Sequence, residues 1–245
     1  MADKKVQDVS ANDADLMMQR ARGFWGKFSK PIIYVGAALI FVIGGYFGYK
    51  YLYKLPKEDK ANQNIIAAEN LFDKMAMNHT FNKDSVNIVL NGVANRPGFP
   101  KVIGLLSIIK DYSGTDAGNR ARFLAGACYI HTGEFEKGIK QLKEFEPNGT
   151  LAAFPYYDLL AVANAELKKN DDALSYYKKE VSINSKEEVL TPAALKRAGD
   201  FCYHIGKLKE AAEFYQRIKD EYPTSTEGAR GAIDKDLARL GQTEQ

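Results

Sequence analysis

Residues 192–223 read PAALKRAGDFCYHIGKLKEAAEFYQRIKDEYP, and two similar stretches precede them in the chain. These are NRARFLAGACYIHTGEFEKGIKQLKEFEP, which begins at Asn119, and FPYYDLLAVANAELKKNDDALSYYKKEV, which begins at Phe154. The three stretches align without gaps, and each has the pattern of two short amphipathic helices joined by a tight turn. A single hairpin cannot bury its apolar face, so the repetition predicts a stack of hairpins that share one core.

Small residues recur where the two helices of each hairpin would cross, at the eighth and twentieth positions of the copies. These positions hold Gly126 and Gly138, Ala161 and Ala173, and Gly199 and Ala211. Glycine also occupies the turn of the first and third copies, as Gly133 and Gly206, whereas the second copy has Lys168 there. Glycine tolerates the positive φ that such a turn requires. This pattern resembles the tetratricopeptide repeat, a helical hairpin of 34 residues, and the third copy matches it best.

A long apolar segment lies far upstream of the repeats. Residues 31–49, PIIYVGAALIFVIGGYFGY, contain no charged side chain and are bracketed by Lys30 and Lys50. As a helix they would span roughly 28 Å, close to the hydrocarbon thickness of a bilayer. About thirty residues precede the segment and no small-residue cleavage site follows it, so we expect an uncleaved membrane anchor rather than a signal peptide.

Two features of this anchor bear on its partners and its orientation. Gly36, Gly44 and Gly48 form a candidate membrane-packing face, with the ordinary glycine content of membrane helices as the alternative. Four basic residues lie within reach of each end, so the positive-inside rule leaves the orientation open.

Between the anchor and the repeats the pattern is less regular. The segment KLPKEDK, at residues 54–60, predicts a polar joint. Residues 59–78 and 100–112 predict helices, the second with Val102 on its apolar face. Residues 80–99 fit either one or two helical turns or a loop, because NGVANRPGFP is rich in chain-breaking residues.

We therefore expect an all-α protein, in which a single N-terminal transmembrane helix precedes a solenoid of helical hairpins. The expected parts are an N-terminal tail with an interfacial helix (1–30), the transmembrane helix (31–52), the joint (53–60), a helical N-terminal part of the array (61–118), three tetratricopeptide repeats (119–224), and a C-terminal capping helix and tail (225–245).

Charge is unevenly distributed along the chain. The whole chain has 34 basic and 31 acidic residues, and residues 1–60 contain ten of the basic and six of the acidic ones. The remainder is therefore close to neutral, which argues against a nucleic-acid partner, since such a partner requires a basic face on the folded domain. The basic N-terminal segment instead predicts contact with anionic lipid headgroups.

No catalytic or cofactor-binding motif is present in the sequence. The three histidines do not pair with carboxylates or cysteines at ligand spacing, so we predict no metal site, no cofactor and no enzymatic activity. Cys128 and Cys202 lie two repeats apart, roughly 20 Å at the usual helix packing distance, and are predicted to be free thiols.

A stack of hairpins binds partners along the surface formed by its first helices. The side chains predicted to face that groove are Phe123, Ile130, His131, Asp158, Val162, Glu166, Lys196, Asp200, Tyr203 and His204. The set is partly apolar and partly charged, and it lacks the paired Lys and Asn pattern that clamps a C-terminal carboxylate. Simple solvation of the groove by these residues is the alternative.

Over nearly its whole length the chain resembles the ancillary SecYEG translocon subunit family. The resemblance rests on the anchor, on KDSVNIVLNG and GFPKVIGLLSIIKDYSGTDAGNRA before the first repeat, and on the repeats. It implies a bacterial inner-membrane protein with a cytoplasmic N-terminus and a periplasmic array. It also implies three kinds of protein partner: the SecYEG translocon, a membrane-anchored periplasmic chaperone with a prolyl-isomerase domain, and nascent secretory proteins.

The expected function is thus non-catalytic protein binding beside the Sec translocon, in support of protein export or periplasmic folding. The alternatives are an envelope scaffold for another inner-membrane machine, an enzyme with an unrecognised site, and an organellar adaptor that faces the cytosol.

Overall fold

The computed structural model describes residues 2–94 and 101–243, and it divides the chain into two units, Met1–Lys57 and Glu58–Gln245. The first unit is helical: α1 (Ala2–Gly48) is followed by a π-helix, η1 (Tyr49–Lys54), and by the start of α2 (Leu55–Met77). The N-terminal tail is helical as part of α1, which continues through it into the apolar segment. The predicted joint at 53–60 contains the boundary between the two units, but its backbone is helical. Pro56 falls in the first turn of α2, where a missing N–H is tolerated, directly after the wider π-turn.

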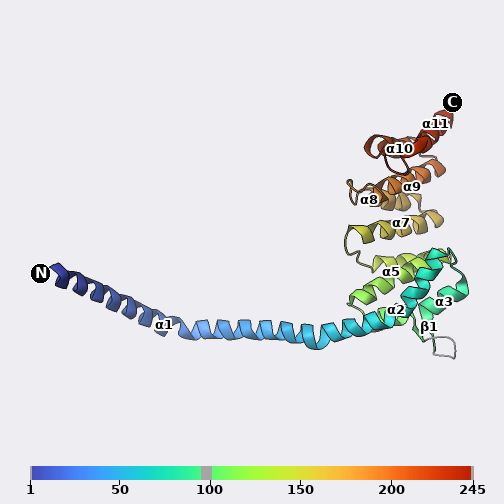
Figure 1. Ribbon diagram of the computed structural model, residues 1–245. Coiled ribbons are helices and arrows are strands. Elements are labelled where there is room, and N and C mark those ends of the chain that lie inside the picture. The colour runs from blue at the N-terminus through green and yellow to red at the C-terminus, as the bar shows by residue number, and fades with distance from the viewer. Residues whose placement is uncertain (1, 95–100, 244–245) are drawn as a thin grey trace. The chain divides into compact units, whose positions relative to one another are not determined.

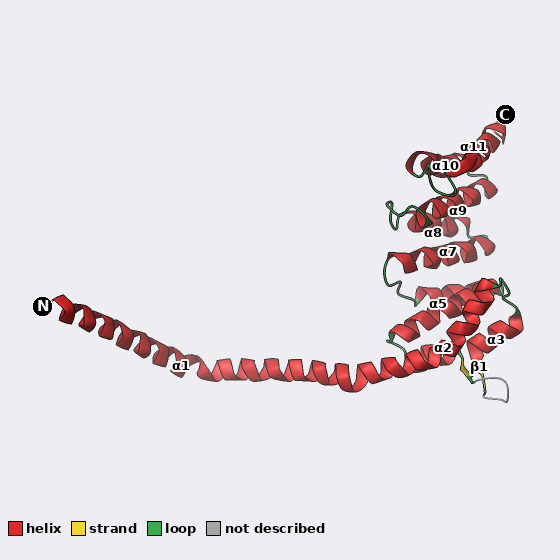
Figure 2. Cartoon of the chain, viewed as in Figure 1, coloured by secondary structure: helices red, strands yellow, loops and turns green. Residues whose placement is uncertain are grey.

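The second unit is a succession of helices, shown in Figure 1 and coloured by secondary structure in Figure 2. After α2 its elements are α3 (Lys83–Asn91), β1 (Gly92–Val93), β2 (Val102–Ile103), α4 (Leu105–Asp111), α5 (Asp116–His131), α6 (Phe135–Lys143), α7 (Thr150–Glu166), α8 (Asn170–Val181), α9 (Leu190–His204), α10 (Leu208–Glu221), the 3-10 helix η2 (Ala229–Gly231) and α11 (Ala232–Thr243).

One short hairpin of strands interrupts the helices. Gly92 pairs with Ile103 and Val93 with Val102 in an antiparallel ladder. The expected helix from residue 100 therefore begins only at Leu105, and Val102 is a buried strand residue. Residues 95–100, part of the predicted loop, lie outside the described residues.

Three hairpins, α5–α6, α7–α8 and α9–α10, follow one another as the repeated sequence predicts. Figure 1 shows α5, α7 and α9 in succession along this unit, and each packs on the next. Close approach within a hairpin depends on small residues. A Cβ at Gly199 would lie 2.4 Å from Cε1 of Tyr215, and one at Gly126 would lie 2.7 Å from Cγ of Leu142.

The core runs through the stack as three clusters. One joins α2, α3, α4 and α5 around Ile65 and Leu105, a second joins α5, α6 and α7 around Leu142, and a third joins α7 to α11 around Tyr215. The expected capping helix is present as α11, and its Ile233 and Leu240 are buried in the third cluster.

Contacts from α2 fix the start of the array. The Glu58 carboxylate accepts hydrogen bonds from the backbone N–H groups of Asp116 and Ala117, at 2.9 and 3.1 Å, and so caps α5. Arg120 of α5 donates to Glu69 and Asn62 of α2. The N-terminal part of the array is thus tied to the first repeat by charge as well as by apolar packing.

Candidate protein-binding site

A partly buried charge cluster lies between the second and third hairpins. It consists of Asp158 from α7, Glu180 from α8 and Arg197 from α9, and is called the Arg197 cluster below. Arg197 Nη2 donates to Glu180 Oε1, and Arg197 Nε lies 3.1 Å from Asp158 Oδ1 in an ion pair without hydrogen-bond geometry. Two carboxylates therefore share one guanidinium.

The cluster is closed at one side and open at the other. The Glu180 side chain is 0% exposed, whereas the side chains of Asp158 and Arg197 are 30% and 39% exposed. Within the described residues, Oε2 of Glu180 and Oδ1 of Asp158 are buried and accept no hydrogen bond. Arg197 Nε is likewise buried without a hydrogen bond, and such unpaired atoms cost free energy. With two carboxylates and one guanidinium, the cluster has one acidic group in excess.

The register of the repeats makes Glu180 unusual. The same position of the other two copies holds Phe145 and Ile218, which are both buried apolar residues. Arg197 likewise stands where the other copies have Leu124 and Leu159. Sequence reasoning missed both residues, although the replacement of an apolar residue by a charge at a core position was a signal that could have identified them.

Burial sets the protonation behaviour of these carboxyl groups. It raises the pKa of Glu180 to about 7, because the loss of water outweighs the attraction of Arg197. Burial also raises the pKa of Asp158 above its usual range, again against the effect of Arg197. The net charge of the cluster therefore changes near neutral pH.

A second cluster joins α9 to α11 and differs from the first in its balance of positive and negative charges. Lys196 Nζ lies 2.6 Å from Asp200 Oδ1 and 3.2 Å from Asp236 Oδ2. Asp236 also pairs with Arg239 at 2.8 Å. This Lys196 cluster holds two cations and two carboxylates. Tyr215 completes it by donating a hydrogen bond to Asp200 Oδ1 at 2.7 Å.

The structure separates the ten predicted groove residues into three groups. Asp158, Lys196 and Asp200 are held in the two charge clusters. Ile130 is a core residue only 6% exposed, so its predicted place in the groove is wrong. Its side chain packs closely against Gly138, where a Cβ atom would leave no room for it. Phe123 and Val162 are half-buried in the cluster around Leu142, and the Phe123 ring lies 5.2 Å from that of Phe145.

The remaining four residues lie near the surface. Glu166 is exposed at the end of α7. The His131 ring stacks on Phe81 at 3.9 Å, and His204 Nδ1 lies 2.7 Å from the carbonyl oxygen of Asp200. The Tyr203 ring is covered by the Arg239 guanidinium at 4.6 Å. Tyr203 therefore contacts the capping helix.

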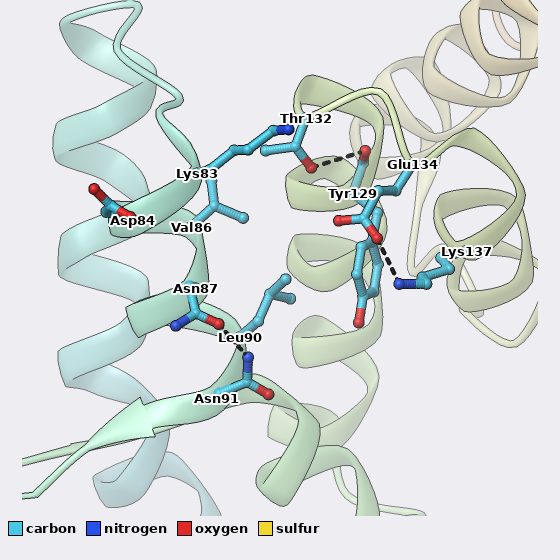
Figure 3. Close-up of a pocket in the computed structure, with 10 residues that line it drawn as sticks. All are labelled: Lys83, Asp84, Val86, Asn87, Leu90, Asn91, Tyr129, Thr132, Glu134 and Lys137. Carbon is cyan, nitrogen blue, oxygen red and sulfur yellow. Dashed lines mark hydrogen bonds and ion pairs between the residues drawn. The ribbon is translucent and has the colours of Figure 1, made fainter.

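A separate polar pocket of about 780 Å³ lies between α3 and the turn from α5 to α6, as Figure 3 shows. Its walls carry the Asn87–Asn91 pair, with Asn91 Nδ2 donating to Asn87 Oδ1 at 2.6 Å, and the Lys137–Glu134 ion pair at 2.5 Å. None of the predicted groove residues lines this pocket.

The chemistry found elsewhere in the described residues is limited. They contain no group of three or more His, Cys, Asp and Glu side chains that could hold a metal ion. Cys128 and Cys202 are free and buried, and burial raises their pKa values to about 12 and about 11. Both thiols are therefore protonated near neutral pH and are poor nucleophiles.

One described helix, Ile33–Met77, is long and apolar enough to cross a membrane by length and composition. It begins in the first unit and continues into the second, and none of its most apolar stretch is buried. A Cβ at Gly36, Gly44 or Gly48 would meet no other atom within 4 Å. The candidate membrane-packing face thus has no partner within the described chain.

Comparison with known proteins bears on the second unit. Residues 169–226 match a family model described as tetratricopeptide repeat. The chain carries a tetratricopeptide repeat. The match covers α8, α9 and α10 and therefore includes Glu180 and Arg197. No curated protein matches the chain. Tetratricopeptide repeats present extended surfaces to other proteins, so this unit is a protein-interaction module.

Proposed function

We propose that the protein is a non-catalytic, membrane-anchored binding module at the Sec translocon, where it assists export or periplasmic folding of secretory proteins. The observation that carries the proposal is the presence, in one chain, of an uncovered apolar helix and a tetratricopeptide repeat. We choose the Sec translocon because three segments resemble ancillary translocon subunits: the anchor, residues 83–92 and residues 98–121.

The anchor has the side-chain distribution of a membrane-spanning helix. Phe41 and Ile40 are 82% and 71% exposed, and contact with lipid would remove this apolar surface from water. Aromatic residues and lysines follow the apolar stretch, and Lys50 and Lys57 lie over the rings of Tyr51 and Tyr53. Amphipathic rings and long basic side chains are typical of the membrane–water interface.

In this proposal the N-terminus is cytoplasmic, the anchor crosses the bacterial inner membrane once, and the array is periplasmic. The array binds a membrane-anchored chaperone with a prolyl-isomerase domain or the emerging secretory chain. Tethering keeps the binding surface close to the translocon exit, so that contacts of modest affinity suffice.

Site-specific photo-crosslinking in cells tests the proposal. A photoreactive residue at Gly44 should crosslink to a translocon subunit, whereas one at Val42, roughly on the opposite side of the same helix, should do so much less. A probe at Glu166 should capture a periplasmic chaperone or a secretory chain, and a probe at Glu213 on a second helix serves as its control. Adducts only with an unrelated envelope machine would replace the proposal with that of a scaffold.

A further inference from the structure

The Arg197 cluster differs from an ordinary structural ion pair between repeats. A single carboxylate would be enough to neutralise Arg197. The Lys196 cluster illustrates such a balance, because it joins α9 to α11 with equal numbers of cations and carboxylates. In the Arg197 cluster a second carboxylate is added at a position that is apolar in the other two repeats. An unneutralised charge in a buried site is costly, so the surplus carboxylate calls for an explanation beyond packing.

The surplus charge can be reached from solvent at one side only. Glu180 lies beneath Arg197 with no exposed surface, whereas Asp158 and Arg197 are partly exposed. An incoming group would therefore meet Asp158 first. To complete the cluster it must be positively charged, and it would pair with the part of the Asp158 side chain that is exposed, because Oδ1 of Asp158 and Oε2 of Glu180 are themselves buried.

We propose that the Arg197 cluster is a specificity site for a lysine or arginine side chain of a polypeptide bound to the array. The side chain would pair with Asp158 at the open side and bring the cluster to neutrality. This inference deepens the protein-binding role proposed above and rests on it, but it does not depend on which machine the anchor meets.

The pH dependence of binding follows from the groups around Glu180, which are Arg197, Asp158 and the Tyr177 ring. Near pH 6 Glu180 is protonated, because burial raises its pKa to about 7, and the cluster is then neutral without a ligand. Near pH 8 the cluster carries its surplus negative charge. A lysine-containing peptide should therefore bind more tightly at about pH 8 than at about pH 6.

Fluorescence anisotropy with the full chain in detergent tests this. The probes are two short labelled peptides of Ser, Ala and Gly that differ only in carrying lysine or glutamine at their central positions. At about pH 8 and low salt, the lysine peptide should bind about five- to tenfold more tightly, as expected for a partly desolvated charge pair. Asp158→Asn should abolish this preference, and Glu180→Gln should abolish its pH dependence.

The control is Glu213→Gln, which removes one exposed negative charge from α10 and should leave the preference intact. Thermal melts establish that every variant is folded. The inference is overturned if the two peptides bind equally, if Asp158→Asn retains the preference, or if spermidine displaces the lysine peptide as well as unlabelled peptide does. Any of these results, with crosslinks from Gly44 to the translocon intact, would leave the proposed function standing.

Discussion

At the scale of single residues, Lys168 occupies the turn between α7 and α8 with φ of 61°. The turns of the neighbouring hairpins place Gly133 and Gly206 at φ of 82° and 78°. A side chain in the left-handed region costs about 1 kcal/mol or more, so Lys168→Gly should stabilise the protein by about 1 kcal/mol and raise Tm by about 2–4 °C. Thermal melts followed by circular dichroism measure this.

Lys169→Gly provides the matched control, because Lys169 has φ of −88° and gains nothing from glycine. An unchanged Tm for Lys168→Gly would show that the turn is not strained by its lysine.

Gly199 sets the separation of the third hairpin. An alanine Cβ there would lie 2.4 Å from Tyr215, whose hydroxyl is fixed by its hydrogen bond to Asp200. Gly199→Ala should therefore reduce the free energy of unfolding by about 2 kcal/mol or more, as measured by urea titration. Gly241→Ala, where a Cβ meets open space within a helix, should change it by less than about 1 kcal/mol and in the stabilising direction.

Glu180 should make stability depend on pH. Its folded-state pKa of about 7 lies above its ordinary value of 4.5, so the folded state holds the proton that the unfolded state has already released. This contribution is complete below about pH 4.5 and is lost as the pH rises through about 7. The free energy of unfolding should thus fall between about pH 5 and about pH 8, by at most about 3 kcal/mol from this group.

Urea titrations at the two ends of that range check the sign. Glu180→Gln should remove most of the decrease, whereas Glu213→Gln should preserve it. An equal decrease in wild type and in Glu180→Gln would show that other groups cause it.

At the scale of elements, the sequence predicts the three hairpins and the capping helix well, because apolar spacing and turn glycines are local signals. It fails at Val102, whose strand exists only through its pairing with Val93, nine residues earlier in the chain. It also fails at Pro56, which reads as a break but lies where a helix start accommodates proline. Both errors concern residues whose conformation depends on neighbours outside the local pattern.

The cap of α5 by Glu58 is an element-scale contact that local pattern also cannot reveal. Glu58→Gln removes the negative charge from the N-terminus of α5 and should lower the free energy of unfolding by about 1 kcal/mol, by urea titration. Asp59→Asn removes the same charge from an exposed neighbouring residue and should have little effect. Equal losses in the two variants would contradict a specific cap.

At the scale of the whole molecule, the sequence assigns three candidate groove residues to first helices but does not reveal their charge partners. Asp158, Lys196 and Asp200 do occupy the first helices, but Asp158 pairs with Arg197 of the next hairpin and Lys196 pairs with Asp236 of the capping helix. The pairing depends on how successive hairpins stack, and single-hairpin periodicity carries no information about it. Alignment of the three repeats places Glu180 at the same position as Phe145 and Ile218, and this comparison would have located the cluster.

The central claim is a chain anchored once in a membrane, with its repeats on the far side from its N-terminus. Because Cys128 and Cys202 are buried, single cysteines at Gln19 and Thr226, both exposed, can be labelled against a low background. The account predicts that the protein stays in the membrane pellet after alkaline extraction. It also predicts that an impermeant maleimide, applied to cells with a permeabilised outer membrane, labels T226C but labels Q19C only after lysis. Release into the soluble fraction, or equal labelling of both cysteines before lysis, would contradict it.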